Sequence, residues 1–316
     1  MITRRTMLGC VAALPVATAQ SPLTPRERVD RALAGKAVDR SPFSLWHHFG
    51  LEKQGPRAHA EASLKFHRDY GTDLIKVMSD FPYPKPSKPW DLKEEKSPFA
   101  PQLEALRIIN QGLGNKAHFV ETIFNPWNVA EKLSSKEEVQ RLKRDQPQKL
   151  LDALNVIARS EANHAGLAVQ AGASGIFLAI ANADLSVLSR EDYERFSAPF
   201  DRIVLEAVRT APLNILHLHG SKIHFASFER GWPAAAINYS VKGTGVPLSE
   251  MRSRYAGVLM GGIDEVDYRT LSVSTLKDQY QSAAKQAGPK FILAPGCSVP
   301  NEATPSELSK LKAVFA

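Results

Sequence analysis

The chain has 316 residues, with 40 lysines and arginines against 33 aspartates and glutamates, so its formal net charge is +7. Hydrophobic residues make up 43% of the sequence, but no apolar run reaches the roughly 18 residues that a membrane-spanning helix needs. Two cysteines exclude a disulfide scaffold and any cysteine-rich zinc or iron–sulfur cluster, and they leave a mixed histidine–cysteine metal site open.

The first 19 residues predict an export signal. An arginine pair, Arg4-Arg5, precedes a short apolar stretch and an Ala-Thr-Ala motif that ends at Ala19. This order is typical of a signal peptide of the twin-arginine type, with cleavage after Ala19 and a periplasmic location for the mature protein. A disordered basic start is the alternative. Cleavage would remove Cys10 and leave Cys297 as the one cysteine of the mature chain.

Loss of the two signal arginines lowers the net charge from +7 to +5. The remaining positive charge is spread along the chain, so we expect a solvated surface and no nucleic-acid partner.

The mature chain begins with a helix, because Thr24-Pro25-Arg26-Glu27 is a capping box with proline at the first helical position and Gly35 ends the segment. Short β-rich runs and longer amphipathic runs then alternate. We expect strands at Phe43–Trp46, Leu74–Val77, His118–Thr122, Gly175–Ala179, Ile215–His219, Ala236–Asn238, Val258–Met260 and Phe291–Ala294. Helices are expected at Ser189–Thr210, Leu271–Gln286 and Thr304–Phe315, among others.

Eight strands that alternate with helices predict a (β/α)8 TIM barrel, formed as a single domain by residues 20–316. A doubly wound open sheet is the alternative, but the glycine-rich phosphate loop that would favour it does not follow the first strand. Residues 81–101 are rich in proline and lysine and predict a surface excursion after the second strand. In a barrel, functional side chains lie where strands end and the following loops begin.

A pair of histidines, His217 and His219, ends the fifth predicted strand. Residues two apart on a strand point to the same side, so both imidazoles can face the barrel mouth. Cys297 follows the eighth strand directly and lies on the same rim. Two imidazoles and a thiolate with an open fourth position are the ligands of a catalytic zinc ion. The alternatives are histidines satisfied by hydrogen bonds and a buried structural cysteine.

Other candidate side chains also follow strand ends. We predict catalytic roles for Asp80, Glu121 and His47, because carboxylates and imidazoles can transfer protons or bind a metal. Substrate contacts are predicted for the remaining rim residues, which are Trp46, His48, Asn238, Tyr239 and Asp264. Each of these residues, taken alone, is also typical of a helix cap or loop anchor.

Short motifs run in order along the mature chain, at residues 28–35, 38–42, 73–80, 172–177, 188–193, 217–220, 260–264 and 294–305. As an ordered set they resemble the uroporphyrinogen decarboxylase superfamily over nearly the whole mature chain. The resemblance implies one (β/α)8 barrel with a deep cleft at the carboxyl ends of its strands.

One branch of this superfamily, the uroporphyrinogen decarboxylases, works without a metal. Its members hold propionates with arginines after the first strand and engage the pyrroles with an aspartate after the second. Asp80 matches that aspartate, but residues 46–52 contain neither arginine, and Cys297 stands where the family has a histidine. Arginine is the natural partner of carboxylates, so the missing arginines count against decarboxylation. Decarboxylation of a tetrapyrrole or other polycarboxylate is therefore the alternative function here.

The second branch contains zinc methyltransferases that move a methyl group to or from a corrinoid protein. Their ligand pattern is His-x-Cys on the fifth strand and a cysteine after the eighth. Here His217 matches the histidine and Cys297 matches the last cysteine. His219 stands where the family has the cysteine of the fifth strand. The resemblance therefore implies zinc held by these three residues, with a substrate heteroatom or Glu121 as fourth ligand.

The predicted function is zinc-assisted methyl transfer or demethylation of a small substrate, with a corrinoid protein as the partner that this branch implies. A non-catalytic periplasmic binding protein is a further alternative. The oligomeric state stays open.

Overall fold

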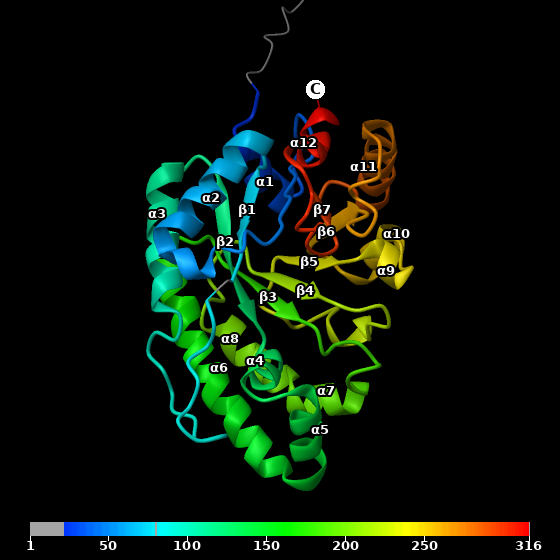
Figure 1. The fold of residues 1–316 in the computed structure, drawn as a ribbon. Coiled ribbons are helices and arrows are strands. Elements are labelled where there is room, and N and C mark those ends of the chain that lie inside the picture. The colour runs from blue at the N-terminus through cyan, green and yellow to red at the C-terminus, as the bar shows by residue number, and fades with distance from the viewer. Residues whose placement is uncertain (1–21, 80, 316) are drawn as a thin grey trace, which may run out of the picture.

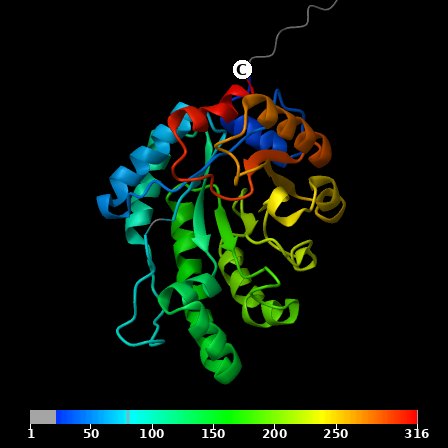
Figure 2. The same cartoon turned by 45° about the vertical axis from the view of Figure 1, so that its right-hand side comes forward.

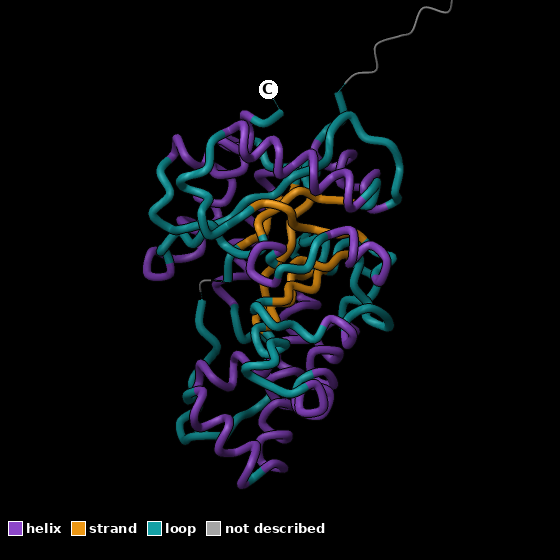
Figure 3. The backbone as a smooth tube through the Cα atoms, turned by 90° about the vertical axis from the view of Figure 1, so that its right-hand side faces the viewer, coloured by secondary structure: helices purple, strands orange, loops and turns teal. Residues whose placement is uncertain are grey.

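The computed structural model describes residues 22–79 and 81–315, and its centre is a parallel sheet of seven strands paired in chain order (Figure 1). The strands are β1 (Leu74–Val77), β2 (His118–Phe124), β3 (Ile176–Ile180), β4 (Ile215–Leu218), β5 (Ala236–Tyr239), β6 (Val258–Ile263) and β7 (Phe291–Pro295). Helices surround the curled sheet, which occupies the middle of the molecule in Figure 3. The fold is therefore α/β, as the alternating sequence pattern predicts.

The α-helices of the described chain are α1 (Pro25–Leu33), α2 (Gly55–Tyr70), α3 (Ala100–Leu113), α4 (Pro126–Leu133), α5 (Lys136–Asp145), α6 (Pro147–Gln170), α7 (Arg190–Phe196), α8 (Ala198–Glu206), α9 (Val241–Thr244), α10 (Leu248–Arg254), α11 (Val273–Ala287) and α12 (Pro305–Ala313). The predicted capping box is present at the start of α1, and a second one begins α12. Helix α6 and its neighbours extend beyond the sheet at the lower end of Figures 1 and 2. Within the described residues, no helix is long and apolar enough to cross a membrane.

The first predicted strand, Phe43–Trp46, is reduced to a single bridge between Phe43 and Leu293 of β7. The Ser44 amide donates to the Leu293 carbonyl at 2.9 Å, and the Phe43 carbonyl accepts from the Asp73 amide at 2.8 Å. This segment is thus hydrogen-bonded to β7 on one side and to the start of β1 on the other. It does not form a regular strand, because the proline at position 42 has no amide hydrogen to donate and Trp46 pairs with the loop after β7.

A predicted helix and a predicted surface excursion can also be compared with the structure. The helix expected at Ser189–Thr210 is divided at Ser197 into α7 and α8, since Ser197 is not helical (φ −130°, ψ −54°) and Pro199 lies in the first turn of α8. The excursion predicted at residues 81–101 is irregular up to the start of α3. The predicted signal, residues 1–19, lies outside the described residues.

Side-chain alternation along the strands separates an interior from an exterior layer. Near the amino ends of the strands the interior is apolar and also contacts Val29 of α1. Its strand residues include Leu74, Val120, Phe177, Ile215, Ala236, Val258 and Ile292. Two residues further along the same strands, the interior positions become polar, as at Lys76, Thr122, His217 and Asn238. An apolar base therefore closes one end of the sheet, and polar side chains collect at the carboxyl ends.

Asp73 joins three parts of the chain at the start of β1. Its side chain is fully buried and accepts hydrogen bonds from Arg28 of α1 at 2.5 Å and from Arg40 at 2.6 Å. It also accepts from the Phe43 amide at 3.0 Å. One carboxylate therefore holds α1 and the bridging segment against β1, with two guanidinium groups compensating its charge.

We expect Asp73→Ala to lower the free energy of unfolding by about 3–5 kcal/mol, because it leaves the buried Arg28 guanidinium with Asp39 as its one remaining acidic partner and removes the acceptor of Arg40 and of the Phe43 amide. Urea unfolding followed by circular dichroism measures this change. Asp69→Ala is the matched control, since its pair with Lys65 is exposed, and should cost less than about 1 kcal/mol. Equal effects of the two substitutions would contradict the anchoring role of Asp73.

Candidate functional site

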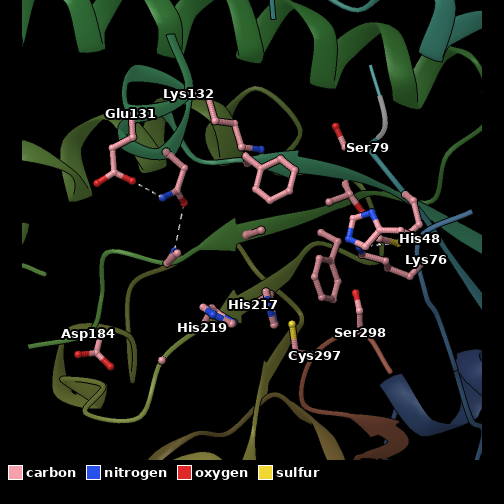
Figure 4. Close-up of a pocket in the computed structure, with 18 of the residues that line it drawn as sticks. His48, Lys76, Ser79, Glu131, Lys132, Asp184, His217, His219, Cys297 and Ser298 are labelled. Carbon is pink, nitrogen blue, oxygen red and sulfur yellow. Dashed lines mark hydrogen bonds between the residues drawn. The ribbon is translucent and has the colours of Figure 1, made fainter. Parts of the chain in front are cut away.

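A cavity of about 630 Å³ opens at the carboxyl ends of the central strands (Figure 4). Inward-facing side chains of β1 to β4 form its floor, and the loop after β7 contributes Cys297 and Ser298. Loops and α4 complete its walls. The cavity is thus built from the part of the fold where barrel-like α/β proteins carry their reactive groups.

His217, His219 and Cys297 meet at one side of this cavity (Figure 4). One ligand atom from each residue lies within 4.8 Å of the other two. His217 is buried, Cys297 is half-buried and His219 is exposed to the cavity. The structure therefore brings together the three residues that the sequence selects as metal ligands, and it leaves their cluster accessible from the cavity.

The orientation of His217 is fixed by its neighbour on β5. Its Nδ1 lies 2.6 Å from Asn238 Oδ1. Asn238 Nδ2 donates to the carbonyls of Met260 and Pro295, so the amide oxygen must accept from the imidazole. Nδ1 of His217 is consequently protonated, and Nε2 is the nitrogen that faces Cys297 and can bind a metal ion after giving up its proton. The ring also stacks on Phe177 at a centroid distance of 4.9 Å. Asn238 thus prepares one nitrogen of His217 for a metal ion.

The thiol of Cys297 is strongly acidic in this setting. Burial disfavours the thiolate, but hydrogen bonds from His217 and His219 outweigh it and lower the pKa of Cys297 to about 4. The hydrogen bond to Cys297 in turn raises the pKa of His219, against the opposing effect of burial. A thiolate beside an imidazolium is the stable pair when no metal is bound.

The loop that carries Cys297 is positioned by contacts of Gly296 that were not predicted from the sequence. The Gly296 amide donates to Glu265 Oε2 at 3.1 Å. A Cβ at Gly296 would lie 2.2 Å from the Cα of Ser240, so a larger residue would push the loop away from β5. No local sequence signal identifies these contacts, because Glu265 and Ser240 approach the loop only in the folded chain.

Three lysines line the rest of the cavity, together with the acidic residues Glu131 and Asp184. Lys76 of β1 is 8% exposed, and its ammonium lies 5.1 Å from the Phe177 ring centroid and 3.0 Å from Met78 Sδ. Lys132 of α4 and Lys136 of α5 also line the cavity. Lys76 was not among the predicted site residues, although a charged residue within an otherwise apolar strand was a usable signal.

The first rim segment divides between two sides of the chain. Trp46 and His48 line the cavity, as expected of substrate-contacting residues. His47 lies between them and points away, with its ring packed against Phe49 and Phe66 at centroid distances of 5.2 and 5.4 Å. Burial lowers the pKa of His47. Neighbouring side chains of an extended segment point to opposite sides, so His47 faces away from the cavity when Trp46 and His48 face it. The predicted catalytic role of His47 is therefore not supported by its position.

Glu121 also faces away from the cavity, contrary to its predicted catalytic or metal-binding role. Its oxygens pair with His164 Nε2 at 2.9 Å and Gln102 Nε2 at 2.8 Å, both on helices outside the sheet. The next residue, Thr122, takes the inward position and lines the cavity. Glu121 therefore connects β2 to the surrounding helices.

Three predicted substrate contacts lie behind the cavity. Asn238 is fully buried and acts on His217, whereas the adjacent Tyr239 points outward and donates to the Val246 carbonyl at 3.2 Å. Asp264 forms an ion pair with Lys242 at 2.5 Å and accepts from backbone amides of its own loop. None of the three lines the cavity. Asp80, the remaining predicted catalytic residue, lies outside the described residues.

In chelator-treated protein, we expect the alkylation rate of Cys297 by iodoacetamide to change less than about threefold between about pH 6 and pH 8, because the thiolate is already formed. Mass spectrometry of the peptide that contains Cys297 measures the rate. His219→Gln removes one stabilising imidazole and should make the profile steeper. A wild-type rate that rises about 100-fold over this range, as for an ordinary thiol of pKa about 8.5, would contradict the assignment.

Solved structures of two methyl-transferring proteins resemble this chain in fold. A methyltransferase from Methanosarcina mazei is 18% identical, with a TM-score of 0.75 over 92% of this chain and 98% of its own. A B12-independent methionine synthase from Shewanella sp. W3-18-1, solved with selenomethionine, is 12% identical, with a TM-score of 0.59 over 87% of this chain and 92% of its own.

Comparison with curated protein sequences gives no match. The family model described as uroporphyrinogen decarboxylase (URO-D) matches residues 82–314, which is well over half of the chain. This match includes β2 to β7, the histidine pair and Cys297. The ordered motifs, the parallel sheet and the family match agree, and the chain belongs to the uroporphyrinogen decarboxylase family.

Proposed function

We propose that this protein is an enzyme that carries out zinc-assisted methyl transfer or demethylation of a small substrate. The observation that carries the proposal is the cluster of His217, His219 and Cys297 at the wall of the main cavity. The methyltransferases of similar fold support the same class of reaction. Segment 42–44, bonded to β7 and β1, is proposed as the eighth strand position of a (β/α)8 barrel.

The three side chains suit a zinc ion by chemistry and by spacing. Small rotations can bring atoms within 4.8 Å of one another to the zinc bonding distances of about 2.0–2.3 Å. Cys297 is already in the thiolate form that a metal ion requires, and Asn238 holds His217 with Nδ1 protonated, so that Nε2 is the nitrogen that loses its proton to the metal. When bound, zinc would act as a Lewis acid that lowers the pKa of a substrate thiol or other heteroatom.

The fourth position of such a site is left to the substrate. Glu121 is paired with His164 and Gln102 outside the sheet, so it is no longer a candidate ligand. Lys76 and His48 lie on the cavity wall where they can orient an anionic part of the substrate. In the transfer itself, the carbon–donor bond breaks with its electron pair staying on the donor, and a carbon–heteroatom bond forms to an acceptor that has lost its proton. A corrinoid protein is the proposed methyl-exchange partner.

Decarboxylation of a polycarboxylate has less support from the same cavity. Its described lining contains lysines but no arginine, so it does not offer the bidentate guanidinium contacts that would fit several propionates. A decarboxylase without a metal would also leave the clustered His217, His219 and Cys297 without a role.

The test combines metal analysis with a methyl-transfer assay. We expect purified protein to bind about one zinc ion per chain and to transfer a methyl group from methylcobalamin to a small thiol from a panel, followed by the absorbance of the corrinoid. Cys297→Ser should remove both properties. Asn238→Ala should weaken zinc affinity by about 10–100-fold, because the His217 tautomer is no longer fixed.

Glu121→Gln serves as the control, since it changes a carboxylate that faces away from the cluster, and it should leave zinc content unchanged. Protein with no bound zinc and a melting temperature unaffected by chelator would overturn the proposal. Carbon dioxide release from a polycarboxylate by the Cys297→Ser variant would support the decarboxylase instead.

We also propose that residues 1–19 direct export by the twin-arginine route, from the Arg4-Arg5 pair and the Ala-Thr-Ala motif ending at Ala19. Export of a folded chain suits a protein that binds its metal before crossing the membrane. Cell fractionation should find the wild-type chain in the periplasm and the Arg4→Lys, Arg5→Lys variant in the cytoplasm. A cytoplasmic wild-type chain would refute this route.

A further inference from the structure

A side pocket of about 250 Å³ lies next to the main cavity. The two spaces share the lining residues Ser79, Phe124 and Lys132, so the side pocket is an extension of the main cavity. In Figure 4, Ser79 and Lys132 lie at the edge of the main cavity away from the histidine–cysteine cluster. The excursion after β1, the start of α3, helix α4 and helix α6 enclose this second space.

The wall of the side pocket contains a buried carboxyl group with no partner. Glu161 of α6 is fully buried, and neither of its side-chain oxygens has a hydrogen-bond partner among the described residues. Burial and the nearby charge of Asp201 raise the pKa of Glu161, and Lys132 opposes this effect without a hydrogen bond to the carboxyl. An unsatisfied buried carboxyl costs free energy, so its presence in a pocket wall points to a ligand that pairs with it.

Aromatic rings make up much of the remaining wall. Phe81, Tyr83, Phe99 and Phe124 all line the pocket, together with Lys85 and Lys132. Tyr83 and Phe99 pack edge to face, with ring centroids 5.8 Å apart. The Phe124 ring already holds a cation at the boundary with the main cavity, since the Lys132 ammonium lies 3.0 Å from its centroid. Aromatic faces attract cations and offer nothing to an anion.

We propose that this side pocket binds the protonated amine of a small ligand, with Glu161 as its counter-ion and the aromatic rings as its walls. A carboxylate ligand could pair with Lys85 or Lys132 of the same wall, but an amine is the ligand that gives the ionised Glu161 carboxyl a partner. The oxygens of Asp201 are already occupied by Asn125, Tyr193 and Ser197, so Glu161 is the acid that remains available. The amine site needs no metal. A methyl-transfer substrate that reaches this pocket would carry an amine. This last step rests on the proposed function, and the amine site itself does not.

Calorimetric titration with n-butylamine, n-butanol and butyrate, three probes of similar shape and different charge, tests the site. We expect saturable binding of butylamine near neutral pH and no detectable binding of the other two. Glu161→Gln keeps the size of the side chain and should weaken butylamine binding at least tenfold. Glu131→Gln, the same substitution in the wall of the main cavity, should leave binding unchanged.

Phe81→Leu provides a second variant that does not alter the buried carboxyl, and it should weaken butylamine binding by several fold through the loss of one aromatic face. Cys297→Ser should bind butylamine normally, which separates failure of the amine site from failure of the zinc proposal. Equal affinity of the wild type and Glu161→Gln, or preferential binding of butyrate, would overturn the inference.

Discussion

The alternation of side chains along parallel strands is the constraint on which the rest of this structure depends. It packs one set of residues into an apolar base beneath the cavity and sends the other set to the surrounding helices. At the carboxyl ends the inward set turns polar, which places Lys76, Thr122 and His217 around one space. Neighbouring residues on the same strands then serve structural contacts, as Glu121 and Tyr239 do.

The cavity joins two kinds of chemistry that no single strand supplies. On one wall, an acidic thiol lies beside two imidazoles, and Asn238 of the next strand sets the protonation of His217. On the other side, the irregular excursion and α6 add an aromatic pocket with the unpaired Glu161 carboxyl. In the proposed reaction, the distance between the two sites would select the length of the substrate, and the histidine–cysteine cluster would select its reacting atom.

Local patterns predicted most of the regular structure. Seven strands lie where apolar, β-branched runs indicate them, because strands buried on both faces need such residues. The bridging segment at Phe43 and the break at Ser197 were the main differences. Each difference lies next to a proline, Pro42 or Pro199, and involves hydrogen bonds to segments distant in sequence. The buried ion pairs of Asp73 with Arg28 and Arg40 were likewise beyond local patterns, since they join α1, the bridging segment and β1.

The amino-acid sequence was enough to predict the α/β class, the starts of most strands and the position of His217 and His219 on one face of a strand, because these depend on spacing along one short segment. It also identified Cys297 as a thiol that follows the last strand. The tertiary structure decided which member of each adjacent pair faces the cavity: His48 and not His47, Thr122 and not Glu121. It also decided that Glu161 is buried without a partner. Which of two adjacent residues at a strand end faces inward depends on packing against distant segments, and so does what surrounds a buried residue of a helix. Spacing within one segment does not encode either of them.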